Sequence, residues 1–387
     1  MSPGGSYTAL REEIDAVLER GFSEELLAGA VVMINHDGKT AYFRAYGFAD
    51  PENGVEMQVD SLFRLSSVTK LYTSLAAAAL IEQKKIGLDD PVTKWLPEFT
   101  PKTLDGNTPV ITIRHLLTHT AGLDYKWAQV ENGPYELANV SDGLDISGIT
   151  LEENLKRIAS VPLRFVPGTR YQYSLSPDVL GAVIAKAHGT TFEKAMADLL
   201  TDPLGMKDSR FVATSEDRAR MTVPFFHFYG GLVPMEADQY VENELGWLFL
   251  FSPDRVFDPD AYPSGGVGMI GTAYEVMLLV EAVRNGRLPT VSEDTMKMMS
   301  TNVLPAGMPE DPSLGYCKGW GMMLDPALAQ SPQSVGTQLG GGVYGHIWFT
   351  DPEKKLSVVI MTTTAITVRS EHISTHIRNA IYEHLPG

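Results

Sequence analysis

The chain has 387 residues, of which 44% are hydrophobic and 20% are charged. This length favours two or three domain-sized units with a large hydrophobic core. The formal net charge of −17 argues against a nucleic acid or an anionic membrane as the partner, because both carry charge of the same sign. Cys317 is the only cysteine, which excludes an intrachain disulfide and a cysteine-rich metal site.

The beginning of the chain bears on its location in the cell. Residues 1–10 lack the basic and apolar regions of a secretion signal, and no apolar run approaches the roughly 20 residues that span a bilayer. These features predict a cytoplasmic protein without a membrane partner. A mature form that has lost its leader would have a similar sequence, although Met1 argues against that alternative.

The first predicted elements are a helix and a hairpin. Apolar residues at helical spacing predict an amphipathic helix over about 9–19. Two strand-like runs, 29–35 and 40–46, follow this helix in the sequence. Asp37-Gly38 lies between the two runs, and an Asp-Gly pair in that position is typical of a β-hairpin turn.

Several later helices carry signals for their ends. The helix that begins near residue 67 is expected to end at Gly87, because the C′ position of a helix favours glycine. A second helix is expected to begin at Ser176-Pro177 and to end at Gly189. The sequence Thr272-Ala273-Tyr274-Glu275 predicts a capping box at the start of a third helix.

The middle of the chain differs from its two ends. From about residue 91 to 263, predicted helices alternate with loops that are rich in proline and glycine. The segments 124–150 and 222–263 are aromatic and loop-like, so each either lines a pocket or forms connecting surface. Further elements are predicted near the C-terminus: strand-like runs at 318–324, 345–350 and 356–363, and a helix at about 370–384. The pattern predicts a discontinuous α/β domain of residues 1–75 and 265–387, interrupted by a helical domain of residues 76–264.

Ser67-Val68-Thr69-Lys70 is the first candidate for chemistry, at a point where a loop becomes a helix. Residues three apart share a helix face, so the Lys70 amine can reach the Ser67 hydroxyl. A serine is a weak nucleophile until a neighbouring base takes its proton, and a lysine can be that base in a suitable environment. The alternative is that Ser67 caps the helix while Lys70 is solvated.

Two other segments give this pair a context. They are Pro167-Gly168-Thr169-Arg170-Tyr171-Gln172-Tyr173-Ser174-Leu175 and Gly340-Gly341-Gly342-Val343-Tyr344-Gly345-His346. Together with Ser67 and Lys70, their order and spacing resemble the serine β-lactamase and penicillin-binding-protein superfamily. The resemblance is strongest to class C β-lactamases, DD-peptidases and family VIII carboxylesterases, and it extends over nearly the whole chain. It implies an α/β plus α fold, in which an antiparallel sheet is flanked by helices and joined to a mainly helical second domain.

The resemblance also implies roles for individual residues. Ser67 corresponds to the nucleophile that becomes acylated, Lys70 to its base and Tyr173 to the catalytic tyrosine. Tyr171 is the competing candidate for the tyrosine, and packing is its expected role. The backbone N–H groups of Ser67 and Val343 would form the oxyanion hole. The resemblance implies neither a metal nor a cofactor.

Two departures from the family pattern point to the substrate. Leu175 stands where these β-lactamases have asparagine, and Gly340 stands where they have lysine. Without that amide and that cation, the site suits neutral esters better than β-lactams. Family VIII esterases often have tryptophan or histidine at this glycine, so Gly340 departs from them too and is expected to open space for a bulkier group. The predicted substrate-binding residues are Leu175, Gly340, Gly341, Gly342 and His346.

These features together predict a serine carboxylesterase that hydrolyses small or medium esters through a covalent acyl-serine. A β-lactamase or a DD-peptidase shares the chemistry, but it would be expected to have the missing Asn and Lys and an export signal. An acyltransferase would form the same acyl-enzyme and replace water by an alcohol or an amine. A non-catalytic binding protein is the remaining alternative, and it would need a reason to retain Ser67, Lys70 and Tyr173 together.

Overall fold

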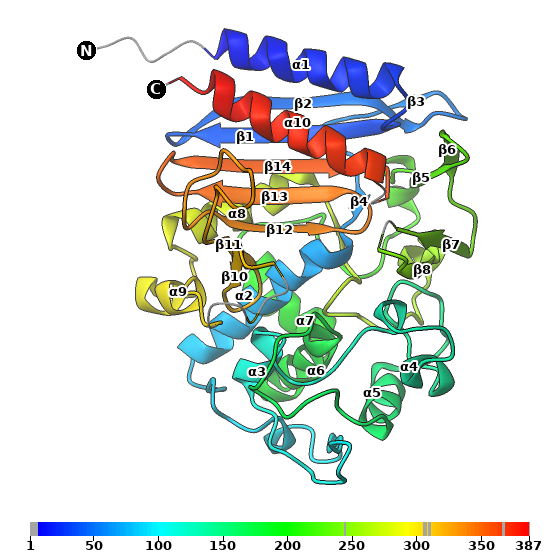
Figure 1. The fold of residues 1–387 in the computed structure, drawn as a ribbon, viewed down its shortest axis with the longest axis vertical. Helices are drawn as coiled ribbons and strands as arrows, with labels where there is room; N and C mark the ends of the chain where they lie inside the picture. The colour runs from blue at the N-terminus through cyan, green and yellow to red at the C-terminus, as the bar shows by residue number, and fades with distance from the viewer. Residues whose placement is uncertain (1–6, 244, 305–307, 309–310, 366–367, 387) are drawn as a thin grey trace.

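An eight-stranded antiparallel sheet occupies the upper half of Figure 1, and most of the smaller helices lie below it. The computed structural model describes residues 7–243, 245–304, 308, 311–365 and 368–386, and side chains in the last range from residue 373 onward. The spatial order of the strands is β10 (Leu314–Tyr316), β11 (Gly321–Met323), β12 (Gln338–Gly342), β13 (His346–Asp351), β14 (Leu356–Thr362), β1 (Gly29–His36), β2 (Lys39–Asp50) and β3 (Val55–Glu56).

The two faces of this sheet are covered by different helices. Alternate residues of a strand point to opposite faces. In β1, Val32 and Ile34 pack with α1 (Thr8–Ser23) and α10 (Val368–His384), which lie side by side. Val31 and Met33 belong instead to the larger core with α2 (Thr69–Glu82) and α8 (Ala273–Asn285). The helix α2 is therefore buried deep in the protein; Lys70 lies in its first turn, and Ser67 lies in the short turn just before it.

The remaining elements lie between the two groups of sheet strands in sequence. The helices are α3 (Ile113–Leu117), α4 (Pro134–Leu137), α5 (Leu151–Ser160), α6 (Ser176–His188), α7 (Phe192–Met196) and α9 (Glu293–Met299). Three small two-stranded sheets pair β4 (Phe63–Arg64) with β9 (Ile270–Gly271), β5 (Phe225–Phe228) with β6 (Gly231–Pro234), and β7 (Gln239–Glu242) with β8 (Leu248–Phe251). The helices α3 to α7 form a mainly helical region that lies in the sequence between the strands β3 and β10 of the large sheet. The boundaries at residues 75 and 265 stay a prediction.

Several predicted local features are confirmed. Asp37 and Gly38 form the turn between β1 and β2 with φ angles of 49° and 75°, both in the left-handed region that such a turn requires. The helix α6 begins at Ser176 and is followed by Gly189, whose φ of 83° makes it the left-handed residue that ends the helix.

The predicted end of the helix after Ser67 is wrong. The helix α2 ends at Glu82, and Lys84 takes the left-handed conformation with φ of 56°. The Lys85 N–H then donates to the Leu80 carbonyl at 2.9 Å, which satisfies a carbonyl at the helix end. Gly87 lies beyond this turn, and its N–H donates to the Asp90 carboxylate at 2.8 Å. A non-glycine residue thus performs the role that the sequence signal assigned to glycine.

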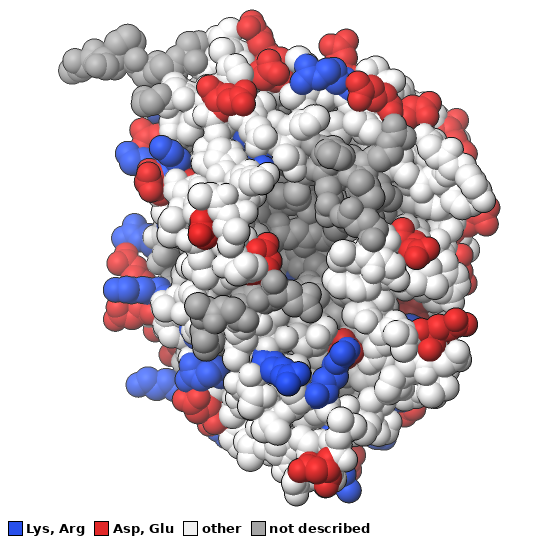
Figure 2. Space-filling model, in the orientation of Figure 1, with Lys and Arg blue, Asp and Glu red and all other residues white. Residues whose placement is uncertain are grey.

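On the face drawn in Figure 2, the described Lys, Arg, Asp and Glu side chains lie mostly toward the periphery. Within the described parts of the chain, no helix has the length and apolar character needed to cross a membrane.

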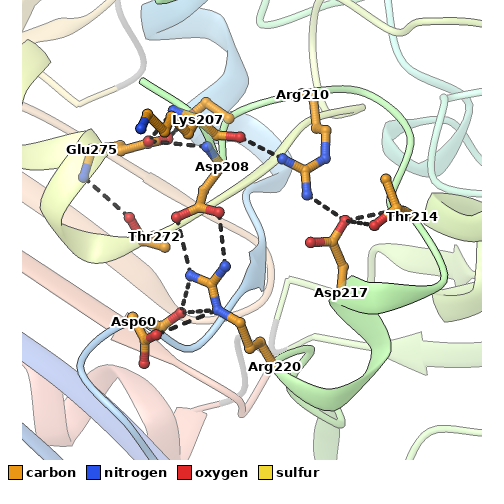
Figure 3. Close-up of polar contacts among 10 residues, drawn as sticks. Asp60, Lys207, Asp208, Arg210, Thr214, Asp217, Arg220, Thr272 and Glu275 are labelled. Carbon is orange, nitrogen blue, oxygen red and sulfur yellow. Dashed lines mark hydrogen bonds and ion pairs between the residues drawn. The ribbon is translucent and has the colours of Figure 1, made fainter. Parts of the chain in front are cut away.

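Glu275 changes the predicted capping box. Thr272 Oγ1 accepts a hydrogen bond from the Glu275 N–H, as the signal predicted. The Glu275 carboxylate turns instead to the loop between α7 and β5, where it accepts from the N–H groups of Lys207 and Asp208 at 2.6 and 3.0 Å and from the Ser209 hydroxyl at 2.6 Å. Figure 3 shows this carboxylate beside the Arg220 and Arg210 ion pairs of the same loop. Only half of the box is formed, because tertiary donors compete for the glutamate.

The role of Glu275 is testable by stability measurements. Replacing it with alanine removes the acceptor of two part-buried N–H groups and of the buried Ser209 hydroxyl, so Glu275→Ala should lower the free energy of unfolding by about 1–3 kcal/mol. Glu293→Ala is the matched control, because Glu293 also lies in the first turn of a helix but forms only an exposed ion pair with Arg287. The control should lose less than about 1 kcal/mol in urea unfolding. Equal losses in the two variants would contradict the assigned role.

Candidate active site

The turn before α2 holds Ser67 in a fixed position. Ser66, the residue before it, is fully buried and has a φ of 44°, a left-handed conformation that is uncommon for a residue with a side chain. The Leu65 N–H donates to the Met269 carbonyl at 2.8 Å, which attaches the turn to the segment before β9. Such strain persists only where the surrounding structure enforces it, and it is often found at functional sites. Ser67 itself lines the larger of two neighbouring cavities.

Lys70 makes the contact that the helix spacing predicted. Its Nζ lies 3.0 Å from Ser67 Oγ and donates to the Gly266 carbonyl at 3.0 Å. The side chain is only 3% exposed. Its Nζ also lies 4.6 Å from the ring centre of Tyr173 and 5.4 Å from that of Tyr125. Two rings and one backbone carbonyl therefore confine the amine to a place beside the serine.

Tyr173 approaches the same point from the segment that leads into α6. Its ring packs against the rings of His119 and Tyr125, with centroid distances of 4.7 and 5.6 Å. His119 Nδ1 accepts a hydrogen bond from the Ser174 N–H at 3.1 Å, which fixes the backbone next to the tyrosine. Burial, with a contribution from the charge of Lys70, keeps the pKa of His119 well below its usual value, so the imidazole is a neutral packing partner.

The three glycines of β12 allow close approach on three sides. A Cβ at Gly342 would lie 2.3 Å from Ser66 Oγ and 2.8 Å from the Leu65 carbonyl, so any side chain would push β12 away from the serine turn. A Cβ at Gly341 would lie 2.5 Å from the backbone carbonyl of His346. A Cβ at Gly340 would lie 2.7 Å from Trp348 Nε1 on the paired strand, so the missing side chain leaves room for the indole.

His346 and Leu175 differ in how they relate to the cavity. His346 lines the larger cavity, but its Nε2 donates to the Arg64 carbonyl at 2.8 Å and its Nδ1 accepts from the Thr362 N–H at 3.3 Å. Both ring nitrogens are thus engaged by backbone groups. Leu175 is fully buried at the start of α6 and is not among the described residues that line the two cavities.

Ser67 and Val343, the predicted oxyanion-hole residues, line the same cavity with the glycines of β12. That cavity has a volume of about 580 Å³, and a second cavity of about 350 Å³ borders Lys70 and Tyr173. The structure therefore brings the serine, the lysine, the tyrosine and the glycine-rich strand to one place. The glycines lie in β12 and Val343 lies in the turn between β12 and β13, far from Ser67 in the sequence.

An aromatic wall, formed by Trp127, Trp247 and Phe249, was not predicted residue by residue. Trp127 lies 4.8 Å from Trp247 and 4.7 Å from Phe249 between ring centres, and all three line the larger cavity. They come from the aromatic segments 124–150 and 222–263. For these residues, the interpretation that the segments line a pocket is the correct one. Aromatic composition was the only signal, and it did not identify which rings face inward.

Gly266 is a further residue whose role in the site had no sequence signal beyond its Ser-Gly-Gly context. Its carbonyl is the second acceptor for Lys70. Among the described residues, no group of three or more His, Cys, Asp or Glu side chains is arranged to hold a metal ion. The sequence-based expectation that the chemistry requires neither a metal nor a cofactor stays a prediction.

Comparison with known proteins identifies the family. The family model described as Beta-lactamase matches residues 14–381, which is nearly the whole chain. The chain belongs to the beta-lactamase family. It is 41% identical over 380 residues to Esterase EstB from Burkholderia gladioli, and this match covers 97% of the chain and 95% of the relative.

Two solved structures share the fold of this chain. EstCE1, described as a hydrolase with promiscuous acyltransferase activity, is 37% identical with a TM-score of 0.93, covering 97% of this chain and 99% of the other. Simvastatin synthase (LovD) from Aspergillus terreus is 20% identical with a TM-score of 0.75, covering 96% and 98%, and this likeness shows the fold alone. The predictions of the fold class, of the family and of a serine hydrolase are confirmed.

The close approach of β12 to the serine turn predicts the effect of adding one methyl group. Gly342→Ala should displace Ser67 and slow its covalent labelling by an organophosphonate about 100-fold, because a misplacement of about 1 Å can cost that factor. Mass spectrometry of the labelled serine provides the measurement. Gly231→Ala is the matched control in another strand, since the nearest atom to its added Cβ is 3.8 Å away. Labelling of Gly342→Ala at the wild-type rate would contradict this account.

Part of the pH dependence of the free energy of unfolding is expected to come from His346. Burial lowers its pKa to about 4, whereas an unfolded histidine titrates near 6.5. The unfolded chain therefore binds a proton that the folded chain does not, so this contribution is present above pH 6.5 and is lost as the pH falls toward 4. The free energy of unfolding should decrease by about 2 kcal/mol between pH 7 and pH 5 from this residue. Urea unfolding of His346→Gln should show a smaller decrease; an unchanged slope would exclude the assignment.

Proposed function

We propose that the protein is a serine carboxylesterase that hydrolyses small or medium neutral esters through an acyl intermediate on Ser67. The observation that carries this proposal is the 3.0 Å contact between Lys70 Nζ and Ser67 Oγ at the edge of a large, mostly apolar cavity. A nucleophile within hydrogen-bond reach of its base is the recognisable arrangement of covalent catalysis. Ester hydrolysis also agrees with the names of the relatives, one an esterase and one a hydrolase.

Acylation follows from this geometry. Lys70, as the neutral amine, takes the proton of Ser67 while Oγ attacks the ester carbonyl carbon. The N–H groups of Ser67 and Val343 stabilise the oxyanion of the tetrahedral intermediate. Lys70 and Tyr173 return the proton to the alkoxide as the C–O bond breaks, so a neutral alcohol leaves.

Deacylation reverses these roles with water as the nucleophile. Tyr173 passes its phenolic proton to the Lys70 amine and takes a proton from the attacking water. The Lys70 ammonium then gives its extra proton to Ser67 Oγ as the acyl C–O bond breaks. The products are a carboxylic acid and free serine. Because Lys70 Nζ lies 4.6 Å from the ring centre of Tyr173, the two side chains act together in both half-reactions.

Several contacts favour esters over β-lactams. Leu175 has an apolar side chain and is buried, so its side chain offers no polar group that could bind a substrate amide. Gly340 has no side chain, and the space that a first side-chain atom would take is filled by the Trp348 indole. The aromatic wall gives the larger cavity an apolar side next to Ser67. An uncharged acyl or alcohol group is the chemical class that such a surface binds.

Acyl transfer to an alcohol is the second candidate, and the aromatic wall favours it. Trp127 and Trp247 line both cavities, so each cavity offers apolar surface beside the acyl-serine. An alcohol acceptor bound there would compete with water for the same intermediate. The predicted cytoplasmic location and the predicted absence of a nucleic-acid or membrane partner rest on composition and stay predictions.

The test is a panel of short- and medium-chain p-nitrophenyl esters, measured alongside the β-lactam nitrocefin. Ser67→Ala and Lys70→Ala should each lower ester kcat/KM by about 10⁴-fold or more, because residues that act as a unit are lost together. Tyr173→Phe should lose about 100- to 10,000-fold, the usual contribution of a general acid–base group. Tyr171→Phe is the matched control for the tyrosine assignment and should lose much less.

The outcomes separate the alternatives. Ester turnover that survives in Ser67→Ala would exclude the mechanism. Rapid nitrocefin hydrolysis without ester turnover would replace the esterase by a β-lactamase. A larger loss in Tyr171→Phe than in Tyr173→Phe would transfer the tyrosine role to Tyr171. Added alcohol that diverts the acyl product from acid to ester would establish acyl transfer, and an unchanged yield of acid would count against it.

A further inference from the structure

Asp178 is a fully buried carboxylate close to the site that the proposed mechanism does not use. It lies in the first turn of α6, where the helix dipole favours a negative charge. Three groups donate to it: the Ser264 hydroxyl at 2.7 Å, the Gly266 N–H at 2.8 Å and the Tyr262 hydroxyl at 3.4 Å. A carboxyl group that only accepts hydrogen bonds is in the form that an ionised side chain requires.

We propose that Asp178 is the residue that positions Lys70 for proton transfer, by holding Gly266 and by placing a buried negative charge behind it. This inference rests on the proposed function of Ser67 and Lys70. The connection is a short chain of hydrogen bonds: Asp178 Oδ1 accepts from the Gly266 N–H, and the Gly266 carbonyl accepts from Lys70 Nζ at 3.0 Å. Asp178 is thus a positioning residue that acts through one intervening residue, Gly266.

The space around Gly266 shows how tightly these groups converge. A Cβ added there would lie 3.0 Å from Tyr125 Oη, 3.2 Å from Asp178 Oδ1 and 3.6 Å from Lys70 Nζ. Three polar groups from α2, α6 and the segment before α4 therefore face the same side of one glycine. A lysine side chain has four rotatable bonds, and it loses substantial rotamer freedom when its amine is fixed in one position. A fixed acceptor at Gly266 keeps the amine within reach of Ser67.

The charge of Asp178 acts on Lys70 through the interior. Burial raises the pKa of Asp178, and the hydrogen bonds from Ser264 and Gly266 and the charges of Lys70 and Arg255 oppose that rise. The titratable or charged groups that face Asp178 are Lys70, Arg255, Tyr262 and Tyr125. Those that face Lys70 are Asp178, His119, Tyr125 and Tyr173. Of the groups named around Lys70, Asp178 carries a carboxylate, whereas His119, Tyr125 and Tyr173 carry aromatic rings.

A merely structural carboxylate and a positioning carboxylate predict different kinetics. If Asp178 only holds the loop, its loss lowers activity without moving the pH profile. If its charge faces Lys70, removing that charge disfavours the ammonium form, so the amine becomes available as a base at lower pH. The acidic limb of the kcat/KM profile should then move toward lower pH. The shift is expected to be about one pH unit for a buried pair several ångströms apart.

Asp178→Asn is the decisive variant, because an amide oxygen can still accept from Gly266 and Ser264 while the charge is removed. With a p-nitrophenyl ester, its kcat should fall roughly ten- to a hundredfold with KM within about threefold, as expected for a misplaced group that acts after binding. The acidic limb should move as described. Ser264→Ala removes the 2.7 Å hydrogen bond but keeps the charge, so its kcat should fall about three- to tenfold with little movement of the limb.

Asp217→Asn is the matched control. Asp217 is also a buried carboxylate that accepts from a backbone N–H and a hydroxyl, both of Thr214, and it pairs with Arg210 in the loop shown in Figure 3. It lies in the network around Glu275, outside the residues that line the two cavities, so its loss should affect unfolding while kcat and the pH profile stay within about twofold of wild type. Circular dichroism of each variant confirms that the comparison is between folded proteins.

The failures of the two proposals are distinguishable. Ester turnover in Ser67→Ala, or none in the wild type, would overturn the proposed function. An inactive Ser67→Ala together with a wild-type kcat and pH profile in Asp178→Asn would overturn the positioning role alone. A limb that moves to higher pH would also overturn it. If Asp178→Asn does not fold, a wild-type kcat in Ser264→Ala overturns the proposal, and the expected fall supports it.

Discussion

The approach of β12 to the turn before α2 is the constraint on which the site depends. Gly342 lies so close to Ser66 that a single added carbon would overlap its hydroxyl. This contact joins the sheet to the turn that holds Ser67, just before the helix that carries Lys70, and it brings Val343 to the same cavity. The left-handed conformation of Ser66 and the absence of a side chain at Gly342 are two parts of one packing arrangement. The site forms where β12 meets the start of α2, and neither element alone brings these residues together.

A second layer of buried polar groups supports this junction. Asp178 and Ser264 contact each other and Asp178 accepts from the Gly266 N–H, while the Gly266 carbonyl accepts from Lys70, so the proposed base is held by a backbone group. Burying a carboxylate costs free energy unless donors satisfy it, and here several donors do so. Buried polar networks of this kind are sensitive to the loss of any member. The position of the Lys70 amine therefore depends on a few hydrogen bonds more than on packing in the large hydrophobic core.

The specificity of the site arises on its other side, where side chains rather than backbone dominate. Trp127, Trp247 and Phe249 come from two segments far apart in sequence and meet over the larger cavity. The polar groups that a β-lactam-binding relative would present at positions 175 and 340 are replaced by a buried leucine and a glycine covered by Trp348. Under the proposed function, the same proposed nucleophile and base face a different substrate class, because the walls of a site change more readily than its chemistry.

The sequence alone determined the pieces with local or motif-level signals. The hairpin at Asp37-Gly38, the helix between Ser176 and Gly189 and the Ser67–Lys70 spacing follow from turn chemistry and helical period, which act over a few residues. Where tertiary partners compete, the local signals failed: Glu275 left its capping box for loop donors, and Lys84 ended α2 in place of Gly87. Family resemblance supplied Tyr173 and the strand of Gly340, since no short-range rule connects them to the serine. Only the tertiary structure decided that Gly342 touches Ser66, that three aromatic rings form one wall and that Asp178 reaches Lys70 through Gly266, because contacts between distant segments are set by packing and not by local pattern.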